Sequence, residues 1–357
     1  MSRLREGRIL GKISRTFIPI GIIVLLVVFF FDFREEPAVP DNSAASPQKQ
    51  NIPKEDKDRP VPTTKKSLDS LIGLSAKQVK SKFGGPAGID PSAYGYDWWI
   101  YNQDEQHYMQ IGVEDGEVVT VFAFGRKLNT KPFIIGKKKE GFLKKVPFKS
   151  TISLKVNGGS YQFELSEKEL NVRPLISVDG VSAILYFDSF TGKLAGIRYV
   201  NAETLVKLRP YALSYRGVLI SAGKLSRREW ESIESGEEQH ILDMTNIIRR
   251  RFGLPPLKGN KEVAKVAFQH SKEMAVKDYF SHTSPTAGGL GDRFHDANIA
   301  YQQAGENIAA HYTDGISAVF GWLNSKGHRK NLLHKAYTGL GVGVYKKYYT
   351  QDFIKPF

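Results

Sequence analysis

The sequence predicts an α+β protein with an N-terminal transmembrane helix, a middle α+β domain of two related units, and a C-terminal α-β-α sandwich. Three observations predict this order along the 357-residue chain. An apolar run lies near the N-terminus, between residues 17 and 31. Helix-like and strand-like patterns then alternate from residue 68 to about residue 215. Long amphipathic helical patterns follow, and two adjacent strand patterns end the chain.

The apolar run begins at Phe17, after five basic residues and a single acid in the first fifteen positions. A basic flank before an apolar segment leaves the N-terminus in the cytoplasm. A membrane-spanning helix needs about 20 residues, with a lower limit of roughly 17, and the run with its flanks up to Phe33 only just reaches this length. We therefore expect residues 1–33 to be an uncleaved signal anchor, a single pass through the cell membrane with the C-terminal part outside the cell.

Secretion after cleavage is the alternative. A signal peptide needs small residues soon after its apolar run, and residues 32–36 read Asp-Phe-Arg-Glu-Glu instead. Ser43-Ala44-Ala45 is the first suitable segment, and it lies far downstream. Residues 34–66 hold six prolines among mainly polar residues, so they offer too little apolar area to fold. They are predicted to be a disordered linker that holds the rest of the chain away from the membrane.

Charge and cysteine content restrict the partners. The chain has no cysteine, which excludes disulfides and thiolate metal sites. Its net charge of +14 suits anionic cell-wall polymers and anionic lipid headgroups. Nucleic acid would suit the same charge, but the predicted location outside the cell argues against it. No nucleic-acid partner is expected.

The middle domain is predicted over residues 67–215. Residues 68–83 predict a helix, with Ser75 as a cap for its second half. Two strand–turn–strand patterns follow, one around Asp115-Gly116 and one around Thr191-Gly192. Ile72-Gly73 precedes the first and Ile135-Gly136 the second, which indicates two related units. The aromatic cluster at residues 98–101 is interpreted as core.

This segment resembles the CAP-associated N-terminal domain of Gram-positive surface proteins. The resemblance depends on three short motifs: Ile72-Gly73-Leu74-Ser75, Phe83-Gly84-Gly85-Pro86 and Trp98-Trp99-Ile100-Tyr101. It implies little about function.

The C-terminal domain is predicted over residues 237–357. A long helix is expected to begin near Ser226 and to end at Gly253, and a second to span residues 261–276. Asp314 is expected to cap a third helix. Strands are predicted at residues 339–345 and 348–353. Seven of the eight histidines lie between residues 240 and 334, so this domain is where we expect chemistry.

This domain resembles the bacterial branch of the CAP superfamily, named for cysteine-rich secretory proteins, antigen 5 and pathogenesis-related proteins. Eight short segments occur in the order typical of that family. They are Thr245-Asn246-Ile247-Ile248-Arg249, Gly253-Leu254-Pro255-Pro256-Leu257, His270-Ser271-Lys272-Glu273-Met274-Ala275, Tyr279-Phe280-Ser281-His282-Thr283-Ser284-Pro285, Gly305-Glu306-Asn307-Ile308-Ala309, Trp322-Leu323-Asn324-Ser325-Lys326-Gly327-His328-Arg329, Gly339-Leu340-Gly341-Val342-Gly343-Val344 and Tyr349-Thr350-Gln351-Asp352-Phe353.

The resemblance implies the CAP fold and an extracellular cleft lined by histidine and glutamate. By motif position, His282 and Glu306 match the family's first histidine and first glutamate. Where the family has its second glutamate, this chain has Asn324 and Ser325, so Ser325 is assigned to the ligand cleft. The family's second histidine has no direct match, and His328 is the substitute.

A metal site at His282, Glu306 and His328 is one hypothesis, since imidazole and carboxylate together suit zinc. The spacings of 24 and 22 residues do not bring the three together locally, so only the fold can. The competing interpretation is that both histidines bond to backbone loops and that Glu306 caps the following helix.

No catalytic residue is predicted. The chain lacks a nucleophile elbow, a His-Glu-x-x-His motif and a Gly-rich phosphate loop. We expect a non-enzymatic envelope protein whose cleft binds a lipid, a peptide or a wall fragment. A metal-dependent extracellular hydrolase, such as a peptidase, is the alternative.

Overall fold

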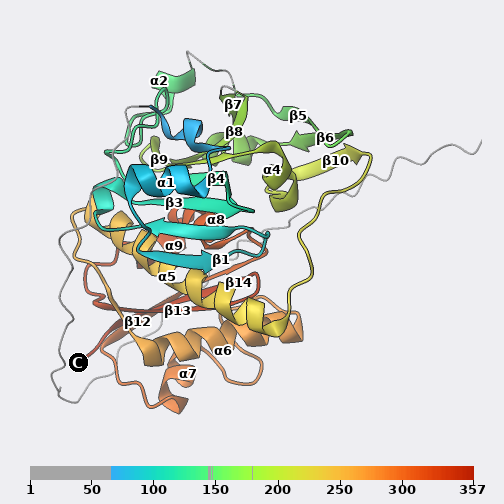
Figure 1. Cartoon of the computed structure of the whole chain (residues 1–357). Coiled ribbons are helices and arrows are strands. Elements are labelled where there is room, and N and C mark those ends of the chain that lie inside the picture. The colour runs from blue at the N-terminus through green and yellow to red at the C-terminus, as the bar shows by residue number, and fades with distance from the viewer. Residues whose placement is uncertain (1–65, 144–145, 147, 179) are drawn as a thin grey trace, which may run out of the picture.

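The computed structural model describes residues 66–143, 146, 148–178 and 180–357, which form two packed parts (Figure 1). The N-terminal part, residues 68–216, contains two β-sheets, and the C-terminal part, residues 227–355, contains one sheet between helices. The predicted signal anchor and the predicted linker up to residue 65 lie outside the described residues. Within the described ranges, no helix has the length and apolar character needed to cross a bilayer.

The larger sheet of the N-terminal part has seven antiparallel strands in the order β1-β2-β3-β4-β9-β8-β7. Both faces are covered, because neighbouring residues such as Trp98 and Trp99 point to opposite faces and both are buried. This confirms that the aromatic cluster is core. The strands are β1 Gly88–Pro91, β2 Asp97–Tyr101, β3 Met109–Glu114, β4 Glu117–Ala123, β7 Leu175–Val178, β8 Val181–Asp188 and β9 Lys193–Val200.

A second, three-stranded sheet has the order β10-β6-β5. Its strands are β5 Thr151–Val156, β6 Gly159–Glu164 and β10 Ala212–Arg216. The helices of the N-terminal part are short. They are the 3₁₀ helices η1 Leu68–Leu71 and η2 Glu105–His107, and the α-helices α1 Ala76–Phe83, α2 Glu140–Leu143, α3 Glu167–Val172 and α4 Ala202–Leu208.

The single helix predicted over residues 68–83 is wrong, because η1 and α1 are separate elements. Gly73 lies between them with a φ of +81°, a backbone conformation that no right-handed helix contains. The predicted cap is confirmed, because Ser75 and Gln78 form a reciprocal capping box at the start of α1.

The two predicted units make equivalent backbone contacts. Gly73 donates from its N–H to the Val118 carbonyl at 2.8 Å, and Gly136 donates to the Leu194 carbonyl at 2.7 Å. Both glycines have positive φ, +81° and +92°. The hairpins β3–β4 and β8–β9 then meet through the antiparallel pair β4–β9 at the centre of the large sheet. The matching contacts support the relation between the two units that the Ile-Gly pairs indicate.

The C-terminal part is an α-β-α sandwich around a four-stranded sheet with the order β11-β13-β14-β12. In Figure 1, α6 and α7 lie on one side of this sheet and α5 on the other. Its elements are α5 Arg227–Arg251, β11 Lys258–Gly259, α6 Lys261–Lys277, α7 Leu290–Asp296, β12 Gln303–Ala310, α8 Gly315–Leu323, α9 Lys326–Leu332, β13 Gly339–Tyr345 and β14 Tyr348–Lys355.

The predicted helices and strands of this part occur close to their expected bounds. Asp314 caps α8, as the sequence predicts, and α5 begins near Ser226 as expected, with Ser226 as its cap. Close packing of α6 on the sheet depends on two glycines of β13. A Cβ atom at Gly341 or Gly343 would overlap the backbone of α6 at Ala264 and Phe268. The absence of side chains at these two positions therefore sets the distance between α6 and the sheet.

The two parts share a buried contact, called here the joint, formed by Tyr96, Arg198, Glu237 and Asp314. The Arg198 guanidinium of β9 forms an ion pair with Asp314 and donates to the Tyr96 hydroxyl at 2.6 Å. The Glu237 carboxylate of α5 accepts from the backbone N–H of Gly315. All four side chains are buried. Beside the joint, the Phe320 ring of α8 stacks on that of Tyr186 at 4.3 Å, so the two parts share one apolar core.

Candidate functional site

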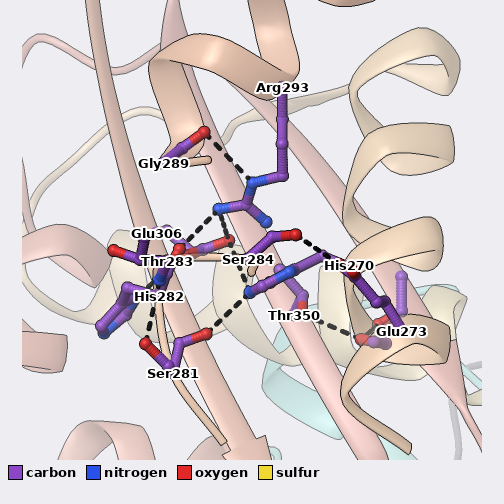
Figure 2. Close-up of polar contacts among 12 residues, drawn as sticks. His270, Glu273, Ser281, His282, Thr283, Ser284, Gly289, Arg293, Glu306 and Thr350 are labelled. Carbon is purple, nitrogen blue, oxygen red and sulfur yellow. Dashed lines mark hydrogen bonds and ion pairs between the residues drawn. The ribbon is translucent and has the colours of Figure 1, made fainter. Parts of the chain in front are cut away.

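Glu306 lies at the centre of a group of polar side chains in the C-terminal part, shown in Figure 2. Its carboxylate is 4% exposed. Oε1 lies 2.8 Å from Nδ1 of His282, and Oε2 lies 2.8 Å from Nη2 of Arg293. Asp352, opposite Glu306 in the β12–β14 pairing, and His270 of α6 complete the group. We call these five residues the Glu306 site.

The loop between α6 and α7 positions His282. Glu273 of α6 holds this loop, because its carboxylate accepts hydrogen bonds from the hydroxyls of Tyr279, at 2.9 Å, and Ser284, at 2.6 Å. Arg293 of α7 adds a second attachment by donating to the His282 carbonyl at 3.1 Å. The His282 backbone is therefore fixed from both neighbouring helices.

His270 of α6 also holds this loop, through a hydrogen bond to its backbone. Its ring is buried, and Nε2 donates to the Ser281 carbonyl at 3.0 Å. The same nitrogen lies 3.9 Å from Oε2 of Glu306. Burial lowers the pKa of His270 to about 4, so the ring is neutral at pH 7. His270 is therefore a core residue that also holds the loop.

Two carboxyl groups of the site have opposite pKa shifts. Burial alone would raise the pKa of Glu306, but the hydrogen bond from His282 and the charge of Arg293 outweigh it, and the pKa is lowered. For Asp352, burial raises the pKa well above its usual range, and the adjacent Glu306 raises it further. The surroundings therefore favour the carboxylate form of Glu306 and the neutral, protonated form of Asp352.

His282 is the member of the site that reaches solvent, since its side chain is 45% exposed. The ring of His328, on α9, lies 6.4 Å from the His282 ring, centroid to centroid. Burial lowers the pKa of His328 to about 4, and nearby His282 adds to this shift. The structure therefore brings together His282, Glu306 and His328, which are far apart in sequence.

The competing interpretation, that the histidines bond to backbone loops and that Glu306 caps a helix, does not describe His282 and Glu306. Nδ1 of His282 bonds to a carboxylate rather than to a backbone loop. Glu306 lies inside β12 and caps no helix, because Asp314 caps α8. Ser325 occupies the N-cap position of α9, where its side chain makes no capping hydrogen bond.

A zinc centre with His282, Glu306 and His328 as ligands does not fit this arrangement. In the part of the chain that the structure describes, no three His, Asp or Glu side chains are placed to hold a metal ion. Both oxygens of Glu306 are already engaged, one of them by the positively charged Arg293. A cation at that carboxylate would have to displace the guanidinium.

Sequence reasoning missed Arg293 and Asp352. Arg293 lies in none of the motif segments, and only the folding of α7 onto β12 brings it to Glu306. Asp352 lies in the last motif, but its contact with Glu306 comes from the register of two strands 46 residues apart. One sequence signal could have indicated which residues share a face with Glu306. Side chains alternate along a strand such as β12, so Glu306 and Asn307 must face opposite sides of the sheet.

Two surface hollows of the molecule lie away from His282 and Glu306. One, of about 390 Å³, lies between α5 and α6. The other, of about 570 Å³, lies beside α9 and is lined by residues of both parts. The Glu306 site itself consists of a buried carboxylate behind an exposed imidazole.

Comparisons with known proteins agree with this architecture. Residues 242–354 match the model of the cysteine-rich secretory protein family, CAP, and residues 72–211 match the CAP-associated N-terminal model. The chain is 45% identical to the uncharacterized membrane protein YlbC of Bacillus subtilis, over 96% of this chain and 99% of that protein. The chain belongs to the CAP family.

Solved structures show the same arrangement of a CAP domain behind an N-terminal part. An extracellular protein containing an SCP domain from Bacillus anthracis matches with a TM-score of 0.78 and 46% identity, covering 87% of this chain and all of that one. A cysteine-rich secretory protein from Staphylococcus aureus matches with a TM-score of 0.72 and 25% identity, covering 83% of this chain and 97% of that one.

Proposed function

We propose that this CAP protein is a non-enzymatic binding protein of the cell envelope that recognises a wall fragment at His282. One observation carries the proposal. The carboxylate of Glu306 is occupied by holding Arg293 and His282, so the buried polar groups of the site fix a loop and present one imidazole to solvent. Such an arrangement favours recognition, because the presented group is held in one orientation before the ligand arrives.

The arrangement also indicates the chemistry of the ligand. Since Glu306 accepts from Nδ1–H of His282, Nε2 is the ring nitrogen left to bond to a ligand. The pKa of His328, lowered to about 4, keeps that ring neutral at pH 7. Phe280, two residues from His282, is 52% exposed and adds an apolar contact. A peptide or sugar that brings hydroxyl or amide N–H donors next to apolar surface suits these groups.

The test uses soluble peptide and glycan fragments of peptidoglycan with residues 67–357. We expect a fragment that binds to raise the melting temperature and to be recovered chemically unchanged. His282→Ala should abolish the shift. His295→Ala is the matched control, because His295 is an exposed histidine of α7 whose side chain is 90% exposed. Equal shifts for the two variants would place the ligand elsewhere.

A hydrolase is the second candidate, because a carboxylate-held imidazole with a free second nitrogen is also the geometry of a general base. Incubation of the same fragments, followed by mass spectrometry, separates the two functions. Cleavage that His282→Ala removes would replace the binding proposal. A parallel sample with added zinc, and metal analysis of the purified protein, test the metal-dependent form of this candidate.

We further propose that residues 1–33 anchor the protein in the cell membrane with the CAP part outside. The apolar run after a basic flank supports this, as do the name of the Bacillus subtilis relative and the extracellular description of the Bacillus anthracis structure. Protease treatment of intact cells should digest the CAP part. N-terminal sequencing of the mature protein distinguishes the anchor from cleavage and secretion.

A further inference from the structure

The hollow beside α9 is a second candidate binding site, distinct from the Glu306 site. Its volume is about 570 Å³. It is formed by one face of α9, the segment that follows α9, the start of β12 and the turn between β8 and β9. The lining residues are Phe190, Gln303, Lys326, Arg329, Lys330, Leu333, His334, Lys335 and Ala336.

The lining is strongly cationic. Lys326, Lys330 and Lys335 are exposed, and none of them forms an ion pair with any residue that the structure describes. No aspartate or glutamate is among the lining residues. Three lysines without carboxylate partners around a concave surface produce a positive potential that attracts anions.

Two of the lysines and Arg329 lie on one face of α9. Lys326, Arg329, Lys330 and Leu333 follow at intervals of three and four residues, so they share one face of α9. Arg329 is fixed by Asp188 of the N-terminal part, with contacts of 2.9 and 3.1 Å to its two carboxylate oxygens. The Asp188 carboxylate is therefore neutralised by Arg329, and this ion pair also holds α9 against the N-terminal part.

An aromatic ring completes the hollow from the other part of the molecule. Phe190, in the β8–β9 turn, is 51% exposed, and the Arg329 guanidinium lies 4.7 Å from its ring centroid. Asp188 fixes this turn by accepting a hydrogen bond from the Phe190 N–H at 3.0 Å. The lining of the hollow thus combines lysines with the apolar side chains of Phe190, Leu333 and Ala336.

The hollow between α5 and α6 serves as an internal comparison. It is lined by three glutamates and two lysines, so its charges compensate one another. The hollow beside α9 has four cations and no acid. The difference shows that the cationic lining is a local property and not only the result of the net charge.

We propose that the hollow beside α9 binds a linear polymer of sugar or polyol units joined by phosphate groups. The three lysines would bind successive phosphates, while Phe190 and Leu333 contact the C–H surfaces of the units between them. An acidic peptide would satisfy the lysines but offers no regular apolar unit. This second site goes beyond the function proposed for His282.

The experiment uses the full-length chain in a neutral detergent and synthetic poly(glycerol phosphate) as the probe. The variant replaces Lys326, Lys330 and Lys335 by Gln. The matched control replaces Lys77, Lys82 and Lys155 by Gln, because these are exposed lysines of the N-terminal part and give the same change in net charge. We expect Kd to rise about tenfold or more for the first variant and less than about twofold for the control.

Two further arms identify the recognised chemistry. Phe190→Ala should weaken binding about threefold without changing its salt dependence, because the ring carries no charge. Poly-glutamate should bind more weakly than the probe, and so should vesicles containing phosphatidylglycerol when they are tested without detergent on residues 67–357, which lack the proposed anchor. Equal weakening by the two triple variants, or tighter binding of poly-glutamate or vesicles, would overturn the proposal. His282→Ala should leave binding of the probe unchanged, so this proposal and the proposed function fail independently.

Discussion

The joint and the Glu306 site use the same chemistry for different purposes. Each has a buried arginine against a buried carboxylate, Arg198 with Asp314 in the joint and Arg293 with Glu306 in the site. At the joint, the other partners are buried too, and the network fastens two folded parts. At the site, the carboxylate has one more partner, His282, which is 45% exposed. A buried ion pair alone therefore does not mark a functional site, and it is the exposed side chain oriented by Glu306 that makes the Glu306 site the candidate.

Energetics follow from this difference. Removing one member of a buried ion pair leaves the other charge without compensation, which costs more than the pair itself contributes. At the joint, the stranded charge would lie between two packed parts with no route to water. At the site, the loop that carries His282 can open and hydrate Arg293. Four predictions test this comparison.

The largest effect is expected at the joint. Asp314→Ala strands Arg198 and removes the cap of α8, and should lower the free energy of unfolding by about 3–5 kcal/mol. Denaturant unfolding measures it. Arg227→Ala is the control, because Arg227 forms an exposed ion pair with Glu231 and should change stability by less than about 1 kcal/mol. Similar losses for the two variants would contradict the assigned importance of the joint.

A smaller effect is expected at the site. Glu306→Ala should lower the free energy of unfolding by about 2–3 kcal/mol, because the released loop gives Arg293 access to water. Amide hydrogen exchange should become faster in residues 279–289, and exchange in α8 should not change. Unchanged exchange in this loop would show that Glu306 does not hold it.

Acidification should act on the two regions in opposite directions. His270 and His328 have folded pKa values of about 4, below the usual 6.5. The stabilising contribution of each neutral ring to the free energy of unfolding is complete above pH 6.5. It is lost as the pH falls toward 4, by about 2 kcal/mol for each ring between pH 7 and pH 5. Burial, and then the charge of Asp314, raise the pKa of Glu237 to about 7. Because the buried carboxyl resists ionisation, Glu237 lowers the free energy of unfolding increasingly as the pH rises from 4.5 to 7. Acidification removes this cost and therefore stabilises the joint.

Hydrogen exchange at pH 7 and at pH 5, corrected for intrinsic rates, measures this contrast. Protection should decrease in residues 279–289 and around α9, and should be kept or increase at the start of α8. Loss of protection in both regions together would mean that the joint and the site open as one unit. His270→Phe should reduce the pH dependence of the loop, because the buried titrating ring is gone.

The smallest effect on stability belongs to His282→Ala. The side chain is almost half exposed, so its removal should cost less than about 1 kcal/mol of unfolding free energy. The variant should nevertheless lose the ligand-dependent rise in melting temperature. A large loss of stability would show that His282 is part of the core support rather than the presented group.

Local signals predicted the C-terminal fold well. The start of α5 near Ser226, the cap at Asp314 and the glycine-rich strand β13 lie where chain-local chemistry decides the structure. The helix expected over residues 68–83 was wrong because the positive φ of Gly73 outweighed the apolar pattern. His282 and Glu306 were found through motifs, whereas Arg293 reaches Glu306 only through packing between α7 and β12. The hollow beside α9 could not be predicted from the sequence for the same reason, because packing between the two parts brings Phe190 to α9.

The stacking of Phe320 on Tyr186 has a practical consequence for the choice of fragments to produce. A fragment that contains only the C-terminal part would expose the Phe320 ring and leave the Asp314 carboxylate without the Arg198 guanidinium. Such a fragment would be less stable and prone to aggregate, so a lack of activity in it would say nothing about the native protein. Both parts should instead melt in one calorimetric transition, and screening campaigns would do best to keep them covalently together.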